Sequence, residues 1–101
     1  MKKAKIYHAY PPNFDCLDVP MTNYKEIAEV KYEADIEEGS DVDIILDYAY
    51  SVSQNVTQNW LGGVAVSPLN GIKHSRSTST GDIVEIDSIK YRCEWIGWKK
   101  I

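Results

Sequence analysis

The sequence predicts a small domain of the α+β class, with a mainly antiparallel sheet of four or five strands and one helix packed across it. Three patterns indicate this fold: alternating apolar and charged residues over 28–35, apolar residues at helical spacing over 41–53, and a self-consistent hairpin over 84–95. A chain of 101 residues has room for one core of ordinary size, so residues 1–101 are treated as a single domain.

The chain begins with a predicted strand over residues 5–9, which Pro11 and Pro12 end. Residues 13–22 are expected to form an irregular surface segment. A second, half-buried strand follows, because residues 28–35 alternate with a period of two. Its inward side carries Ala28, Val30, Tyr32 and Ala34, and its outward side carries Glu29, Lys31, Glu33 and Asp35.

The helix is predicted over residues 41–53. Ser40 stands at the N-cap position, and Asp41 and Asp43 fill the first turn, where the positive end of the helix dipole favours carboxylates. The apolar residues recur with the i, i+3, i+4, i+7 spacing of one buried helix face. They are Val42, Ile45, Leu46, Ala49 and Val52.

Two weakly structured segments follow the helix. Residues 54–63 are polar, contain Trp60 and end in glycine. A short strand is predicted at 64–66, stopped by Pro68. Residues 70–81, which are rich in Ser, Thr and Gly, are predicted to form a long loop that leads into the final hairpin.

The final hairpin has a predicted two-residue turn at Asp87-Ser88. This turn pairs Ile86 with Ile89, Val84 with Tyr91 and Glu85 with Lys90. In this register one face is apolar and contacts the core, whereas the charged pair faces solvent. The apolar face comprises Val84, Ile86, Ile89, Tyr91, Cys93 and Trp95.

Composition excludes several classes of protein. The chain has 44% hydrophobic and 26% charged residues, as ordinary globular domains do. No apolar run approaches the ~20 residues that cross a membrane, and none follows the basic start as in a signal peptide. We therefore expect a cytoplasmic protein without a membrane partner. In that compartment Cys16 and Cys93 are expected to be free thiols.

No catalytic or metal-binding constellation is evident, so we expect no cofactor, no metal and no enzymatic activity. His8 and His74 lack further ligands at metal spacing and are expected to be ordinary surface histidines. A triad could be drawn from Ser77 or Ser79 with His74 and Asp82. It is rejected because side chains so close along one loop rarely reach the required geometry.

Three motifs occur together in the second half of the chain. They are Ser53-Gln54-Asn55 with Trp60 five residues after Asn55, Arg76-Ser77-Thr78-Ser79-Thr80-Gly81-Asp82 directly before the hairpin, and the closing Ile96-Gly97-Trp98. In this order and spacing they resemble small uncharacterised proteins of tailed bacteriophages and related mobile elements. Those proteins share an Arg-Ser-x-Ser-x-Gly-Asp lead-in to a C-terminal β-hairpin and a terminal aromatic-Gly-aromatic signature.

The resemblance covers residues 24–101 and has two departures. Ile96 replaces the first aromatic of the last motif, and the usual Asp-Gly turn is Asp87-Ser88. Serine at positive φ costs about 1 kcal/mol relative to glycine, which leaves a turn longer than two residues as an alternative. The resemblance implies a viral source and a fold, and it supplies no activity.

The candidate binding residues come from these motifs and from the basic, aromatic hairpin. They are Gln54, Asn55, Trp60, Arg76, Ser77, Ser79, Asp82, Arg92 and Trp95. The hydroxyls and cation of the Arg76–Asp82 loop could receive a phosphate or carboxylate. We prefer the structural interpretation, in which the hydroxyls satisfy backbone groups and Gly81-Asp82 turns the chain into the hairpin.

These features favour a non-enzymatic viral accessory protein that binds a host or viral macromolecule, for example to inhibit a host defence or host enzyme. A host or viral protein is the partner we expect, with nucleic acid as the alternative. The acidic stretch 15–47, with a net charge of −9, could imitate a nucleic-acid phosphate array. We prefer a solvated strand face, because its acids alternate with core residues.

Two other functions are kept as alternatives. The first is a nucleic-acid-binding module that uses the Arg76 loop and the basic aromatic hairpin, distantly similar to PUA-like and ASCH domains. The net charge of −4 opposes it. The second is a small enzyme that acts on a phosphorylated ligand. A polar pocket where the Ser/Thr segment, a histidine and carboxylates converge would require an enzyme to be considered again.

Overall fold

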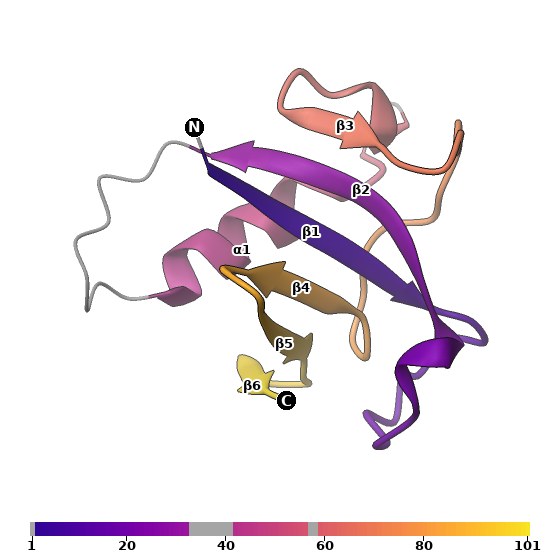
Figure 1. The fold of residues 1–101 in the computed structure, drawn as a ribbon, viewed down its shortest axis with the longest axis vertical. Coiled ribbons are helices and arrows are strands. Elements are labelled where there is room, and N and C mark those ends of the chain that lie inside the picture. The colour runs from indigo at the N-terminus through magenta and orange to yellow at the C-terminus, as the bar shows by residue number, and fades with distance from the viewer. Residues whose placement is uncertain (1, 33–41, 57–58) are drawn as a thin grey trace.

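Six antiparallel strands form one sheet, in the order β3-β2-β1-β4-β5-β6 (Figure 1). The computed structural model describes residues 2–32, 42–56 and 59–101. The strands are β1 Lys2–Ala9, β2 Tyr24–Tyr32, β3 Val66–Pro68, β4 Ile83–Ile86, β5 Ile89–Cys93 and β6 Trp98–Lys100. The helical elements are α1 Val42–Val52 and the short 3-10 turns η1 Met21–Asn23 and η2 Trp60–Gly62. The α+β class is confirmed, but the sheet has six strands rather than four or five.

Strand β1 lies in the middle of the sheet and joins its two halves. It pairs with β2 from Lys2 opposite Tyr32 to Ala9 opposite Tyr24, and with β4 through Ile6 opposite Val84. The β1–β2 register shifts between Ile6 and Tyr7, and the pairing passes over Ile27. This bulge interrupts the alternation of β2, so that Ile27 and Ala28 are both buried.

The core lies between one face of the sheet and α1, which crosses it (Figure 1). The predicted inward residues of β2 that are described, namely Ala28, Val30 and Tyr32, are all buried. So are three of the five helix residues, Ile45, Leu46 and Ala49, whereas Val42 and Val52 are half-buried at the edge of the core. Full burial of such side chains contributes roughly 1.5–3 kcal/mol each. The predictions for Ala34, Glu33, Asp35, Ser40 and Asp41 fall outside the described residues.

The prediction for the short strand was wrong in position. Val64 is fully exposed, and β3 runs over Val66–Pro68 instead. The backbone turns first, with the Val66 amide donating to the Gly63 carbonyl, and only then meets β2. The strand ends at Pro68, as predicted, and Pro68 is itself its last residue, which an edge strand tolerates.

The hairpin has the predicted register and a two-residue turn. Asp87 and Ser88 both have positive φ, 51° and 67°, so the alternative of a longer turn was wrong. The inward placement of Trp95 was also wrong. Strand β5 ends at Cys93, and the chain turns through Gly97 into β6, which leaves Trp95 78% exposed.

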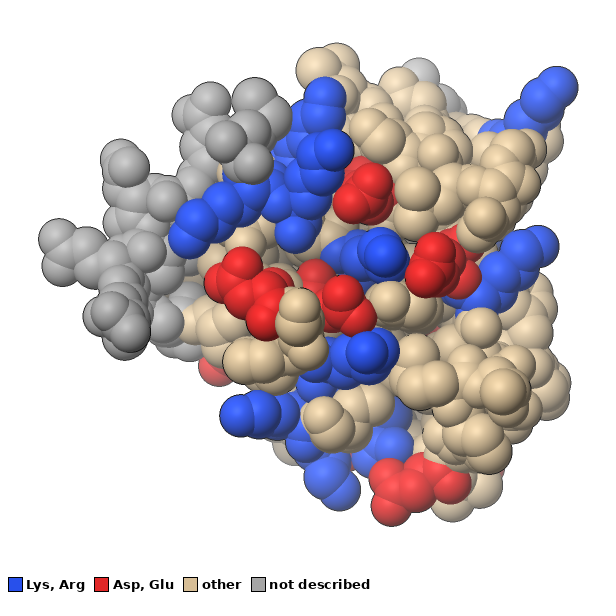
Figure 2. Space-filling model, viewed as in Figure 1, with Lys and Arg blue, Asp and Glu red and all other residues tan. Residues whose placement is uncertain are grey.

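The other face of the sheet is open and carries charges of both signs (Figure 2). Lys5 lies 3.7 Å from Glu26, and Lys90 lies 3.1 Å from Glu85. Acids and bases therefore alternate here as on an ordinary solvated sheet. In the described part of the chain, no helix has the length and apolar character needed to cross a membrane.

Candidate functional site

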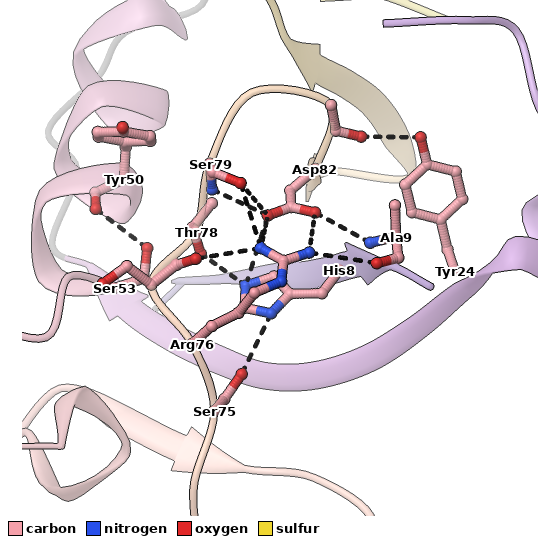
Figure 3. Close-up of polar contacts among 12 residues, drawn as sticks. His8, Ala9, Tyr24, Tyr50, Ser53, Ser75, Arg76, Thr78, Ser79 and Asp82 are labelled. Carbon is pink, nitrogen blue, oxygen red and sulfur yellow. Dashed lines mark hydrogen bonds and ion pairs between the residues drawn. The ribbon is translucent and has the colours of Figure 1, made fainter. Parts of the chain in front are cut away.

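Asp82 is the centre of a buried polar cluster beneath the Ser/Thr-rich loop (Figure 3). Its carboxylate is 1% exposed. It accepts hydrogen bonds from Arg76 Nη1 and Nη2 at 2.6 and 2.9 Å and from the backbone amides of Ala9 and Ser79 at 2.9 Å each. The carboxylate thus ties the loop to the end of β1 at the point where β4 begins.

Arg76 lies across this carboxylate with its side chain 29% exposed. Nη2 also donates to the Ala9 carbonyl at 3.2 Å, and the guanidinium lies 5.9 Å from the centre of the Tyr10 ring. The hydrogen bonds that Arg76 donates to Asp82 raise the pKa of Arg76. In the described part of the chain, the buried Nε atom of Arg76 has no hydrogen-bond partner.

His8 belongs to the same cluster, and its prediction as a surface histidine was wrong. The side chain is completely buried. Nε2 lies 2.9 Å from Thr78 Oγ1 and 3.8 Å from Asp82 Oδ2, whereas Nδ1 lies 3.1 Å from Ser75 Oγ. Burial lowers the pKa of His8 to about 4, with the Arg76 charge acting in the same direction and Asp82 opposing it. The imidazole is therefore neutral at pH 7, with one nitrogen donating and the other accepting.

The segment after α1 holds the same loop from the other side. Gln54 Nε2 donates to the Thr78 carbonyl, and Asn55 Nδ2 donates to the Ser75 carbonyl. Ser77 Oγ accepts from the Asn55 amide, and Trp60 Nε1 donates to the Arg76 carbonyl. Seven of the nine predicted residues therefore form one cluster: Gln54, Asn55, Trp60, Arg76, Ser77, Ser79 and Asp82.

An open hollow of about 730 Å³ lies over this cluster. It is lined by Tyr10, Asn55, Asn59, His74, Ser75 and Arg76. Ser75 is half-buried at its floor, above the imidazole of His8. Sequence reasoning missed Tyr10, Asn59 and Ser75. Asn59 and Ser75 each directly precede a motif residue, whereas Tyr10 follows β1 and is far from all three motifs in sequence.

The two remaining predicted residues, Arg92 and Trp95, do not join this cluster. Arg92 is only 4% exposed and donates to Glu94, to Asp18 and to the Leu17 carbonyl. Its charge is therefore matched within the protein. Trp95 is exposed, and its Nε1 donates to the Phe14 carbonyl at 3.0 Å.

Trp95 is part of a cluster of large exposed apolar side chains, which we call the Trp95 surface. It consists of Phe14, Leu17, Trp95 and Ile96, which are 55%, 60%, 78% and 95% exposed. The two contributing segments are held together by the Trp95–Phe14 and Arg92–Leu17 hydrogen bonds and by Cys16 Sγ, 3.5 Å from the Cys93 carbonyl. Of these four residues, the sequence predicted only Trp95 as a binding residue. No pattern in the sequence around residues 14–17 predicts that they lie beside β5.

No family model, curated protein or solved structure matches this chain. The two sites are therefore interpreted from their own geometry.

Within residues 2–32, 42–56 and 59–101, no group of three or more His, Cys, Asp or Glu side chains is placed to hold an ion. Cys16 and Cys93 are free thiols, and burial raises the pKa of each to about 11. Both are therefore protonated at neutral pH and poor nucleophiles.

Proposed function

We propose that this protein is a viral accessory protein that acts by binding a host or viral protein through the Trp95 surface. The observation that carries the proposal is the cluster of four large apolar side chains, each more than half exposed, on two segments held side by side. Exposed apolar clusters of this kind commonly mark protein interaction sites, and tryptophan is enriched among the residues that dominate their binding energy.

The Trp95 surface is held in shape before any partner binds. The indole is fixed by its bond to Phe14, and the Leu17 carbonyl by Arg92 Nη1 at 3.1 Å. The Glu94 amide donates to the Gly97 carbonyl and closes the turn between β5 and β6. Pre-organisation of this kind lowers the entropy lost on association.

The charges beside the surface favour a protein partner over nucleic acid. The carboxylates of Asp15, Asp18 and Glu94 are close to it in sequence or by contact, and Asp18 is 88% exposed. Arg92, the cation between them, is buried and paired. A base stacked on Trp95 would bring its phosphates toward these carboxylates, whereas an apolar pocket with a basic rim would complement them.

The resemblance of the 53–60, 76–82 and 96–98 motifs to proteins of tailed bacteriophages and mobile elements supports the viral part of the proposal. Under this proposal, the partner is a protein that the bacteriophage or mobile element encounters in the bacterial cytoplasm. Inhibition of a host defence or a host enzyme is a function that a small binding domain can perform by covering a surface.

The test compares the binding of two double variants, of which the second is the control for the first. Trp95→Asp with Ile96→Asp removes the apolar side chains, whereas Val64→Asp with Ile44→Asp places equal charge at exposed apolar positions elsewhere. A partner captured from bacterial lysate is purified, and its affinity for each protein is measured by calorimetry. We expect the first variant to lose at least ~30-fold in affinity, the ~2 kcal/mol of a hot spot, and the second to bind normally.

Equal binding by both variants would contradict the proposal. The nucleic-acid alternative is tested in parallel with labelled single-stranded DNA and RNA. Affinity that falls steeply with salt and is lost in Arg92→Ala would support that alternative instead.

A further inference from the structure

We propose that Ser75 is a reactive nucleophile, with His8 as its general base, and that the hollow above it accepts small carboxylic esters. This inference is independent of the Trp95 surface, which lies elsewhere. It starts from the juxtaposition of a half-buried hydroxyl, an imidazole and a carboxylate drawn from β1 and from the loop before β4 (Figure 3).

The imidazole has the orientation that a general base needs. Ser75 Oγ lies 3.1 Å from Nδ1, within the reach of a proton transfer. On the opposite side of the ring, Nε2 contacts the Thr78 hydroxyl at 2.9 Å and faces the Asp82 carboxylate at 3.8 Å. Because a carboxylate favours the ring N–H on its own side, we assign the ring proton to Nε2 and the acceptor role to Nδ1, which then receives the hydrogen bond from Ser75.

The orienting groups are themselves fixed. Asp82 is held by Arg76 and by two backbone amides. The Thr78 amide donates to the Ser53 carbonyl at the end of α1. Arg76 opposes the charge of Asp82, so the imidazolium formed in the reaction is stabilised less than in a serine protease. We therefore expect a slow enzyme rather than a fast one.

The hollow suits a small ester more than an anion. Its Tyr10 ring offers an apolar wall, and the Arg76 guanidinium is already paired with Asp82. The amides of Asn55 and Asn59 already donate to backbone carbonyls of the loop. Open access on one side lets substrate, alcohol and water exchange.

The reaction follows from this geometry in two balanced halves. Ser75 Oγ attacks the ester carbonyl carbon while its proton passes to Nδ1 of His8; the C–O bond to the alcohol breaks, and the departing oxygen takes that proton. Water then attacks the acyl carbon and gives a proton to Nδ1, and Ser75 Oγ leaves with that proton. Ester and water yield acid and alcohol, and the protein is regenerated.

An alkyl fluorophosphonate tests the nucleophile without a known substrate. Attack by Ser75 forms an O–P bond and releases fluoride, so intact mass and peptide mapping report the labelled residue. We expect one label, on Ser75, that is absent in Ser75→Ala. Ser51→Ala is the matched control, because Ser51 is an exposed serine of α1 that belongs neither to the lining of the hollow nor to the cluster beneath it. It should label as the unmodified protein does.

His8→Gln tests the base and should slow labelling at least ~100-fold, within the range that general bases contribute. If that variant does not fold, the pH dependence of labelling in the unmodified protein replaces it, with folding followed by circular dichroism in the same buffers. The rate should be constant from pH 8 to 5 and fall about tenfold per pH unit below the His8 pKa of about 4. Three results would overturn the proposal. The first is labelling no faster than in Ser75→Ala, the second is a label on another serine, and the third is a labelling rate that does not fall at pH values below the His8 pKa.

Discussion

At the scale of single residues, Asp82 connects segments that are far apart in the sequence. One carboxylate links an arginine six positions earlier, the loop backbone and the end of β1, from which it is separated by more than 70 residues. Because it is buried with its counter-ion, it stabilises the fold only while every partner is present.

Asp82→Asn should lower the free energy of unfolding by about 3–5 kcal/mol, because it leaves the Arg76 charge without its counter-ion. Glu26→Gln is the control, since it removes a carboxylate of comparable size from the half-exposed pair with Lys5. That change should cost less than ~1 kcal/mol. Urea unfolding of the two variants measures both values, and equal losses would contradict the assignment.

His8 should make the protein sensitive to acid. Its folded-state pKa of about 4 lies below the ordinary 6.5, so the unfolded chain binds the proton more readily between these values. The stability due to neutral His8 is complete above pH 6.5 and is lost progressively as the pH falls toward 4, by about 3 kcal/mol in all. The ionisable groups that face the ring are Asp82, whose charge raises the pKa of His8, and Arg76, whose charge lowers it.

The measurement is the unfolding free energy from pH 7 to 4, for the unmodified protein and for His8→Gln. The glutamine variant starts lower and should lose less stability over this range, because position 8 no longer titrates. Parallel curves for the two proteins would show that His8 does not contribute.

At the scale of elements, the helices and strands that have a clear sequence pattern of their own were predictable. Helix α1 and the β4–β5 hairpin are defined by side-chain periodicity and by a two-residue turn, and both lie where these patterns indicate. Strand β6 was missed and β3 was misplaced, since each has three residues and depends on a neighbouring strand. His8 was missed although it continues the alternation of Ala4 and Ile6 on β1; its contact with Ser75, 67 positions away, has no local signal.

The β4–β5 turn itself can be improved. Ser88 has φ 67°, a conformation that glycine adopts without steric cost. Ser88→Gly should therefore raise the unfolding free energy by about 0.5–1 kcal/mol. The same change at exposed Ser51 within α1 should lower it by a similar amount, because glycine weakens helices. Thermal unfolding of both variants tests the opposite signs.

At the scale of the whole molecule, Gly81 is the point where distant segments meet. Its amide donates to the Cys93 carbonyl, and its own carbonyl accepts from the Tyr24 hydroxyl. A Cβ atom here would fall 1.9 Å from the Asn13 carbonyl oxygen, and φ is 92°. The segment before β2 can pack against the hairpin only because residue 81 has no side chain.

Gly81→Ala should accordingly cost more than ~3 kcal/mol, since it combines strained backbone with a clash against main chain. Gly71→Ala is a matched control at φ 70° with no atom within 4 Å of the added carbon. It should cost only about 1 kcal/mol, the price of the backbone conformation alone. Chemical unfolding measures the free energy of unfolding of both variants. A similar loss of stability in the two would mean that Gly81 and Asn13 are not in close contact in solution.

The central position of β1 has a consequence for synthesis of the protein. A ribosome makes β1 and β2 first, and these two strands can pair as soon as both have emerged. The second edge of β1 stays unpaired until β4 arrives, some fifty residues after β2 ends. A nascent chain paused before residue 83 would thus present an unpaired strand edge, and species of this kind are captured by chaperones or aggregate.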